Sequence, residues 1–181
     1  MRHPLDRNPR RPLRSLRVHS VAPYSPQHVL DQWEGLTKTR GPDLKITHDV
    51  FESIAPGIKN TVRIATDIYG ALSYRTDFDL ALRDVLSTLE TGGDLFFVLQ
   101  KFISNADLLT KILDVDGLPI TMEAYLRKFQ GVELVSSELT ADRTVAFHLR
   151  RTEGPLVTPR LKLIGLDGEK TPPRRTYELV K

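Results

Sequence analysis

Cysteine is absent from the 181-residue chain, so disulfide bonds and metal sites built on thiolates are excluded. Long apolar runs are also absent, since no stretch approaches the roughly 20 residues of a membrane-spanning helix. An excess of one charge is lacking as well: 26 basic residues stand against 23 acidic ones, and the net charge is +3. So small a net charge does not favour a nucleic-acid function. These absences lead us to expect a cytoplasmic protein with no membrane association.

A histidine-based metal site is not expected either. The five histidines are scattered along the chain, and no two of them stand four residues apart on one predicted helix, the spacing that would let them share a metal ion. They are His3, His19, His28, His48 and His148. His148 falls on a predicted strand, where a structural role is the plainer interpretation.

The basic residues gather at the N-terminus. Residues 1–17 hold six arginines against the single acid Asp6, and three prolines there argue against a long helix. We expect residues 1–15 to be a flexible basic arm. Such an arm suits RNA, a phosphate-rich surface or an acidic partner, although a solvated tail or a leader left by an upstream truncation is the plainer interpretation. No apolar segment follows the arm, so a secretory signal is not expected.

Strand and helix patterns alternate over residues 16–153. Apolar content of 40% and charged content of 27% are ordinary for a soluble domain with its own core. Period-two and continuous apolar runs predict four strands, and three- and four-residue apolar spacing predicts two helices between them. The four strands are Leu16–Val21, Leu44–Val50, Thr61–Ile68 and Leu95–Leu99. The first helix should begin at Ser25 and stop near Gly41-Pro42, and the second should begin at Thr76 and end at Thr91-Gly92-Gly93.

Two of these segments carry strong local signals. Thr76 is a candidate N-cap with Asp79 three residues later, an acidic form of the capping box. The run at 95–99 is apolar throughout and follows a double glycine, which predicts a strand buried on both faces. Thr61–Ile68 is β-branched and predicts a buried central strand. The loop between this strand and the helix is expected over Tyr69–Arg75.

The second half of the chain predicts two more helices and two hairpins. Asn105 is expected to cap a helix carrying Leu108, Leu109, Ile112 and Leu113, and Thr121 to cap another carrying Met122, Tyr125, Leu126 and Phe129. Val132–Ser136 and Thr144–Leu149 predict an antiparallel hairpin. Residues 154–181 read as a C-terminal extension with a late hairpin around Asp167-Gly168, whose second arm should be an edge strand because of Pro172-Pro173.

This order of elements predicts an α/β domain of the Rossmann-like layered kind. Its sheet should be mostly parallel, with an antiparallel C-terminal hairpin, and incomplete at its N-terminal side.

Three motifs resemble the class I, Rossmann-like S-adenosylmethionine-dependent methyltransferases from the second strand of that family onward. A helix ending in Leu-x-x-Gly-Gly before a strand matches residues 77–99, with Gly92 and Gly93 at the corner. Residues 46–50 resemble the third strand of the family. Residues 64–74 resemble its fourth strand and the loop that follows it.

The resemblance implies a site at the carboxyl ends of the strands, where α/β sheets hold ligands. Asp49 would accept from the adenine amino group of S-adenosylmethionine and Val50 would donate through its backbone. Asp67, beside Ile68 at the end of its strand, would orient the amino-acid moiety of the cofactor or the methyl acceptor. The alternatives are a simple strand-end acid for Asp49 and a turn- or helix-capping carboxylate for Asp67.

Two tyrosines complete the candidate catalytic set. Tyr69 and Tyr74 would line the acceptor pocket or donate hydrogen bonds through their hydroxyls, whereas half-buried packing is the alternative for each. Asp67 is the third candidate catalytic residue. No metal ligand is expected.

The resemblance breaks where the family grips its cofactor. The sequence has no G-x-G-x-x-G turn after a strand, and the first strand of the family has no counterpart. We therefore expect a methyltransferase, or a truncated or degenerate member of that family, with an unknown acceptor. The alternative is a non-catalytic interaction module with the same fold, which binds a protein or an anionic partner. An incomplete sheet needs covering, and a homodimer or a partner chain would cover it.

Overall fold

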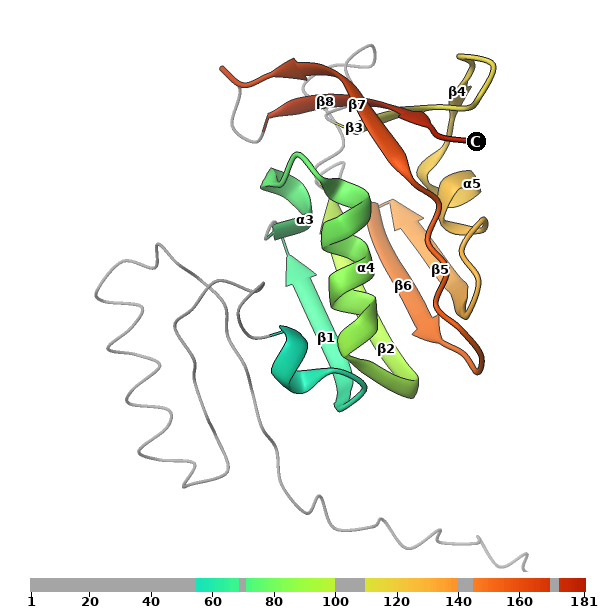
Figure 1. The fold of residues 1–181 in the computed structure, drawn as a ribbon. Helices are drawn as coiled ribbons and strands as arrows, with labels where there is room; N and C mark the ends of the chain where they lie inside the picture. Colours follow the sequence, from blue (N-terminus) through green and yellow to red (C-terminus); the bar gives the residue numbers. More distant parts are fainter. Residues whose placement is uncertain (1–54, 69–70, 100–109, 140–144, 170–172) are drawn as a thin grey trace, which may run out of the picture. The chain divides into compact units, whose positions relative to one another are not determined.

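The computed structural model describes residues 55–68, 71–99, 110–139, 145–169 and 173–181 (Figure 1), and residues 55–181 form one compact unit. The predicted elements before residue 54, together with Asp49 and Val50, lie outside the described residues. Tyr69 does so too.

The first of two sheets contains four strands in the order β1-β2-β6-β5. Parallel pairing joins β1 (Val62–Ile68) to β2 (Leu89–Leu99). Antiparallel pairing joins β6 (Val145–Arg151) to β2 and to β5 (Val132–Leu139). Three strands therefore run in one direction, and β6 runs against them between β2 and β5. The hairpin predicted for β5 and β6 is confirmed, and the sheet is mixed.

Helix α4 (Phe78–Thr88) connects β1 to β2 and lies over one face of this sheet (Figure 1). Its apolar stripe is buried, as the spacing predicted: Phe78, Leu82 and Leu86 are fully buried, and Val85 is 7% exposed. The predicted cap is wrong by one residue. Asp77 is the N-cap and makes no side-chain capping bond. Thr76 precedes the cap, and its carbonyl accepts a hydrogen bond from the Tyr177 hydroxyl.

The burial of β1 and β2 alternates along the strands. Leu95 and Phe97 are fully buried on the face toward α4, whereas Phe96 between them is 42% exposed. The prediction that residues 95–99 are buried on both faces is therefore wrong. Burial was also expected for β1, and the 61% exposure of Ile64 shows that this prediction is wrong for that side chain. Its central position is not tested, because the strands predicted before it lie outside the described residues. Helix α4 covers only one face, and period-two side chains on the other face stay accessible.

The double glycine does not form the expected corner between helix and strand. Helix α4 ends at Thr88 and β2 begins at Leu89, so Gly92 and Gly93 lie inside β2, where its register with β1 shifts. Gly92 has a φ of 82°, a conformation that glycine adopts at little cost. A Cβ on Gly93 would lie 2.9 Å from the carbonyl oxygens of Val62 and Glu90. The second glycine is needed because the chain passes this close to the start of β1.

A second sheet has the strand order β4-β3-β8-β7. Its strands are β3 (Thr110–Leu113), β4 (Pro119–Ile120), β7 (Leu161–Asp167) and β8 (Arg174–Leu179). The late hairpin is confirmed, because β7 pairs with β8 antiparallel. Two other predictions are wrong.

The first error concerns residues 110–113, which were predicted to be helical. They form β3, because this short apolar segment finds a parallel partner in β8. The second error concerns β8, which was expected at an edge and lies between β3 and β7. The strand begins at Arg174, after Pro173, so proline removes no donor from its hydrogen bonds.

The short helix α5 (Met122–Leu126) precedes β5, and the predicted cap is confirmed. The Thr121 hydroxyl accepts from the backbone N–H of Ala124 at 3.1 Å. Tyr125, Leu126 and Phe129 are buried, as the stripe predicted. Within the described ranges, no helix is long and apolar enough to cross a membrane.

Candidate functional site at the carboxyl edge of the first sheet

The carboxyl end of β1 leads into α3 (Ala71–Tyr74) and then into α4, on the side of the first sheet that faces the second sheet (Figure 1). Asp67 pairs with Phe97 of β2, and Ile68 pairs with Val98. One carboxylate oxygen of Asp67 accepts from the backbone N–H of Leu72 at 3.2 Å. This hydrogen bond joins the end of β1 to the first turn of α3. It is the helix-capping role that was considered for Asp67 as the alternative to ligand binding.

The candidate tyrosines and cofactor residues are only partly described. Tyr74 is the last residue of α3, and 48% of its surface is exposed. The structure thus brings Asp67, Ile68 and Tyr74 into one strand–helix connection. Tyr69, Asp49 and Val50 lie outside the described part of the chain.

Two further features of α3 bear on binding. Ser73 is 3% exposed, and its hydroxyl has no hydrogen-bond partner among the described residues. A buried hydroxyl of this kind costs free energy unless another molecule satisfies it. After the helix, Arg75 and Asp77 form an ion pair, with Arg75 Nε 2.7 Å from the carboxylate. This hydrogen bond lowers the pKa of Asp77 and raises the pKa of Arg75.

Arg175 of β8 reaches the same connection from the second sheet. The residue is 2% exposed, and its guanidinium donates to the carbonyls of Arg75 and Leu72, the latter at 3.1 Å. It also donates to the Thr110 hydroxyl of β3 at 2.8 Å, and it lies 5.6 Å from the centre of the Phe78 ring. Burial lowers the pKa of this group. Neutral oxygens and an aromatic face therefore solvate the buried cation.

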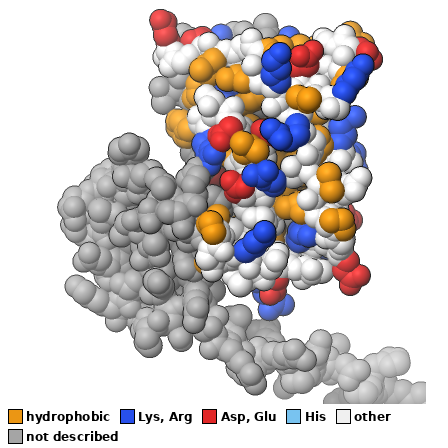
Figure 2. All heavy atoms as spheres, viewed as in Figure 1, with side chains coloured by type: hydrophobic (Ala, Val, Ile, Leu, Met, Phe, Trp, Pro, Cys, Tyr) orange, Lys and Arg blue, Asp and Glu red, His pale blue; other side chains and the backbone are white. Residues whose placement is uncertain are grey.

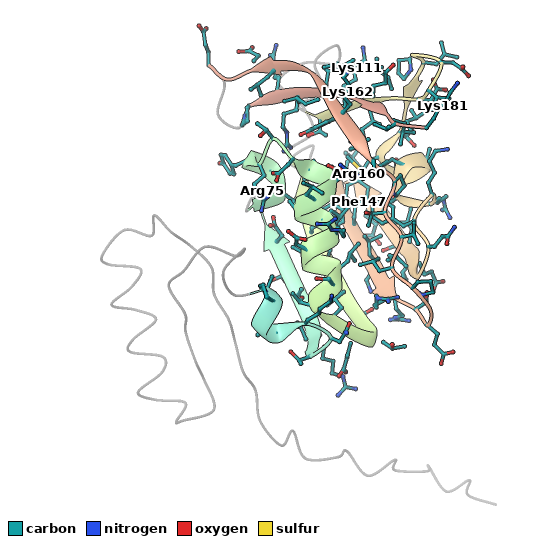
Figure 3. All side chains as sticks on the ribbon, viewed as in Figure 1. Arg75, Lys111, Phe147, Arg160, Lys162 and Lys181 are labelled. Atoms are coloured by element: carbon teal, nitrogen blue, oxygen red, sulfur yellow. The ribbon has the colours of Figure 1, made fainter. Side chains whose placement is uncertain are left out.

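Tyr177, two residues further along β8, continues the contact. Its hydroxyl donates to the Thr76 carbonyl at 2.8 Å, and burial raises its pKa. Asp79 of α4, 4% exposed, accepts from the backbone N–H of Leu161 in β7 at 3.1 Å. Arg160 lies 3.5 Å from the same carboxylate oxygen, on the segment that leads into β7 (Figure 3).

The sequence analysis missed Arg175, Tyr177 and Asp79 as parts of the site. A signal did exist in β8, where Arg175, Tyr177 and Leu179 alternate with more exposed residues. Such alternation indicates a buried face. An arginine and a tyrosine on a buried face need hydrogen-bond acceptors, and backbone carbonyls can serve as these acceptors. The sequence does not show which carbonyls these are, because they belong to residues about a hundred positions away in the chain.

A second polar cluster lies on the face of the first sheet away from α4. Asp94 accepts from Arg150 Nε at 2.9 Å and lies 2.8 Å from His148 Nε2. The His148 ring stacks on Phe96 at 4.3 Å between centroids. Hydrogen bonding to His148 and Arg150 lowers the pKa of Asp94. Each member of the cluster has a partner in the sheet, in line with a structural role for His148.

Charges of both signs are mixed over the face seen in Figure 2, and the described residues hold no group of metal-ligating side chains. Among the described residues, the carboxyl edge offers a carboxylate, an accessible phenol, a buried hydroxyl and backbone groups. These groups can bind and orient a ligand.

The class of fold follows from the strand order. The first sheet joins a parallel pair, β1 and β2, to an antiparallel hairpin, β5 and β6, and a hairpin of this kind was expected from the order of elements. The described part of the chain thus has a methyltransferase-like α/β fold.

Comparison with known proteins agrees at the level of the fold. Neither a protein-family model nor a curated protein matches the sequence. Among solved structures, the [4+2]-cyclase SpnF is similar at a TM-score of 0.50 and 13% identity, over 77% of this chain and 67% of SpnF. A Listeria monocytogenes protein described as an S-adenosylmethionine-dependent methyltransferase is similar at a TM-score of 0.52 and 16% identity, over 76% of this chain and 81% of that one. The antibiotic-resistance methyltransferase Kmr has a TM-score of 0.49 and 17% identity, over 74% of each chain.

Identities this low show a shared fold and leave the activity open. The first two proteins also differ in their described activities, a cyclase and a methyltransferase, which is the general situation for widespread folds. An argument about function must therefore come from the groups at the carboxyl edge.

Proposed function

We propose that the chain is an S-adenosylmethionine-dependent methyltransferase, or a truncated or degenerate member of that family, with its ligand site at the carboxyl edge of the first sheet. The observation that carries the proposal is the placement of Asp67 at the end of β1, beside the parallel partner β2 in a methyltransferase-like strand order. Ligands of α/β sheets bind outside the carboxyl ends of their strands.

The groups at this edge fit the cofactor. The ionised carboxylate of Asp67 can only accept hydrogen bonds, and it suits the ammonium group in the amino-acid moiety of S-adenosylmethionine. The buried hydroxyl of Ser73 is a polar atom that lacks a partner among the described residues. Tyr74, exposed at the end of α3, would contact the acceptor. Asp49 and Val50 complete the proposed set toward the adenine.

The chemistry asks little of the protein beyond positioning. When bound, the sulfonium of the cofactor supplies an electrophilic methyl group with a neutral leaving group. The residues of the site then have to hold the acceptor in line and exclude water. A general base is required only for an acceptor that is protonated at neutral pH. The acceptor itself is not identified by these residues.

Titration calorimetry of the full chain with S-adenosylhomocysteine tests the proposal. Asp67→Asn keeps an oxygen that accepts from Leu72 and removes the charge, so it separates binding from capping. We expect saturable binding that weakens about tenfold in Asp67→Asn, the effect of losing one charge-assisted hydrogen bond.

Asp114→Asn is the matched control. Asp114 also accepts backbone N–H bonds in a turn, from Asp116 at 2.9 Å and from Leu118 at 2.8 Å, and it lies outside the candidate site. This variant should bind like the wild type. Absence of heat at millimolar ligand, or equal weakening in both variants, contradicts the proposal.

A second candidate is a non-catalytic interaction module of the same fold. Two large apolar side chains favour it, because Ile64 and Phe96 are exposed on neighbouring strands of the first sheet. If a second copy of the chain covers them, light scattering will report a dimer that Ile64→Lys dissociates. A wild-type chain that is monomeric at all accessible concentrations contradicts self-association.

A further inference from the structure

We infer that β8 positions residues 71–77, the described part of the connection between β1 and α4, and that Arg175 and Tyr177 are positioning residues for the candidate site. The consequence for ligand binding rests on the function proposed above, whereas the positioning itself does not.

The first observation is where the hydrogen bonds of β8 end. Arg175 and Tyr177 donate to the carbonyls of Leu72, Arg75 and Thr76. These three residues are the middle of α3 and the turn that follows it. Short helices of four residues have little stability of their own, because helix formation carries a costly nucleation step. The connection therefore takes its geometry from partners about a hundred residues away in the sequence.

The second observation is that Arg175 is itself held from several sides. Its guanidinium also binds the Thr110 hydroxyl of β3 and lies over Phe78 of α4. The residue is buried, so water cannot replace these partners at low cost. The planar guanidinium of Arg175 donates to three oxygens in fixed directions, so it sets both the distance and the orientation of its partners. The ammonium of a lysine at the same position could not do this.

The third observation links the positioned segment to the site. The Leu72 N–H donates to Asp67, and its carbonyl accepts from Arg175. One peptide segment thus joins the candidate ligand carboxylate to β8. Ser73 and Tyr74 stand between the residues that β8 holds, so a shift of α3 moves them together. The C-terminal hairpin is therefore a working part of the site.

The chain offers a matched pair of tyrosines for the test. Tyr177 and Tyr125 are both buried, and both donate a hydroxyl to a backbone carbonyl, Thr76 and Pro159 respectively. Each ring also lies beside Phe78, with centroids 6.4 Å and 6.3 Å away. Tyr177→Phe and Tyr125→Phe each remove one oxygen from a similar environment, and only Tyr177 contacts the connection.

Hydrogen exchange of the full-length chain, followed by mass spectrometry, measures the effect. We expect exchange of residues 71–77 to rise about fivefold in Tyr177→Phe and more in Arg175→Lys, since each loses bonds that hold this segment. Tyr125→Phe should leave this peptide as in the wild type. Unchanged exchange at 71–77 in folded Arg175→Lys and Tyr177→Phe overturns the inference, and so does an equal rise in Tyr125→Phe.

Calorimetry with S-adenosylhomocysteine on the same variants separates this inference from the proposed function. Weaker binding in Tyr177→Phe than in Tyr125→Phe supports the role of β8 in the site. Equal binding in the two, in a wild type that binds, contradicts that role. If the wild type does not bind, the proposed function fails, and the exchange result alone decides whether β8 positions the segment.

Discussion

At the scale of the residue, close approach to β1 explains the second glycine of the pair inside β2. A Cβ at Gly93 would meet three backbone oxygens, those of Glu90, Val62 and Arg63, the last at 3.2 Å. Backbone atoms cannot move aside as a flexible side chain can. Steric demand at such a place is a property of the folded chain, so the motif predicted a corner but gave no cost for losing it.

Gly93→Ala should therefore lower the free energy of unfolding by about 1–3 kcal/mol, the range for overpacking a tight site. Urea denaturation measures the loss. Gly57→Ala is the control, since a Cβ at Gly57 meets nothing within 4 Å. Equal stability of the two variants would show that β2 has room for a side chain at position 93.

Charge at Asp94 gives a residue-scale prediction of pH dependence. The pKa of this carboxyl is lowered by its hydrogen bonds to His148 and Arg150. A carboxyl with a depressed native pKa stabilises the fold above its ordinary pKa of about 4, and the contribution is lost as pH falls through the native pKa.

Asp94→Asn should consequently be less stable than the wild type near neutral pH, and the gap should shrink as pH falls below about 4. Urea midpoints measured across that range check the sign. A gap that widens on acidification would mean that the carboxylate does not stabilise the folded state.

At the scale of the element, α4 and α5 show what pattern can and cannot predict. The buried stripes of both helices and the Thr121 cap follow from apolar spacing and side-chain chemistry. The N-terminus of α4 does not, because Asp79 is committed to Leu161 of β7 instead of a capping box. The local sequence around Asp79 predicted a capping box, but in the fold its carboxylate binds the distant strand β7 instead.

Asp79→Ala should detach the start of β7 from α4. The partly buried N–H of Leu161 then loses a charged acceptor, and the expected loss is about 1–3 kcal/mol. Thermal unfolding measures it, with Asp84→Ala as the control on an accessible face of the same helix. If the two variants unfold together, the bond to Leu161 does not couple helix and strand.

At the scale of the whole molecule, the sequence predicted the first sheet better than the second. Hairpin β5–β6 and the β1–α4–β2 unit are local in the chain, and their signals are local too. The second sheet joins residues 110–113 to residues 175–178 in parallel. Such pairing leaves no trace in the period of either segment, so β3 was mistaken for helix and β8 for an edge.

The same reasoning applies to the site. Asp67 and Tyr74 could be placed at a strand end from the order of elements, whereas Arg175 could not, because its partners are backbone carbonyls whose exposure depends on the complete fold. Asp49 and Val50 stay predictions. The carboxyl edge therefore combines residues that pattern predicts with residues that only tertiary packing brings in.

The most direct test of the account is a nuclear magnetic resonance titration of the isotope-labelled full chain with S-adenosylhomocysteine. The account predicts chemical-shift changes that saturate and are concentrated at residues 66–68 and 71–76. Little change is expected at Ile64, Phe96 or His148, which lie on the opposite face of the sheet, away from α4. Shifts confined to that opposite face, or no saturating change at millimolar ligand, would contradict a ligand site at the carboxyl edge.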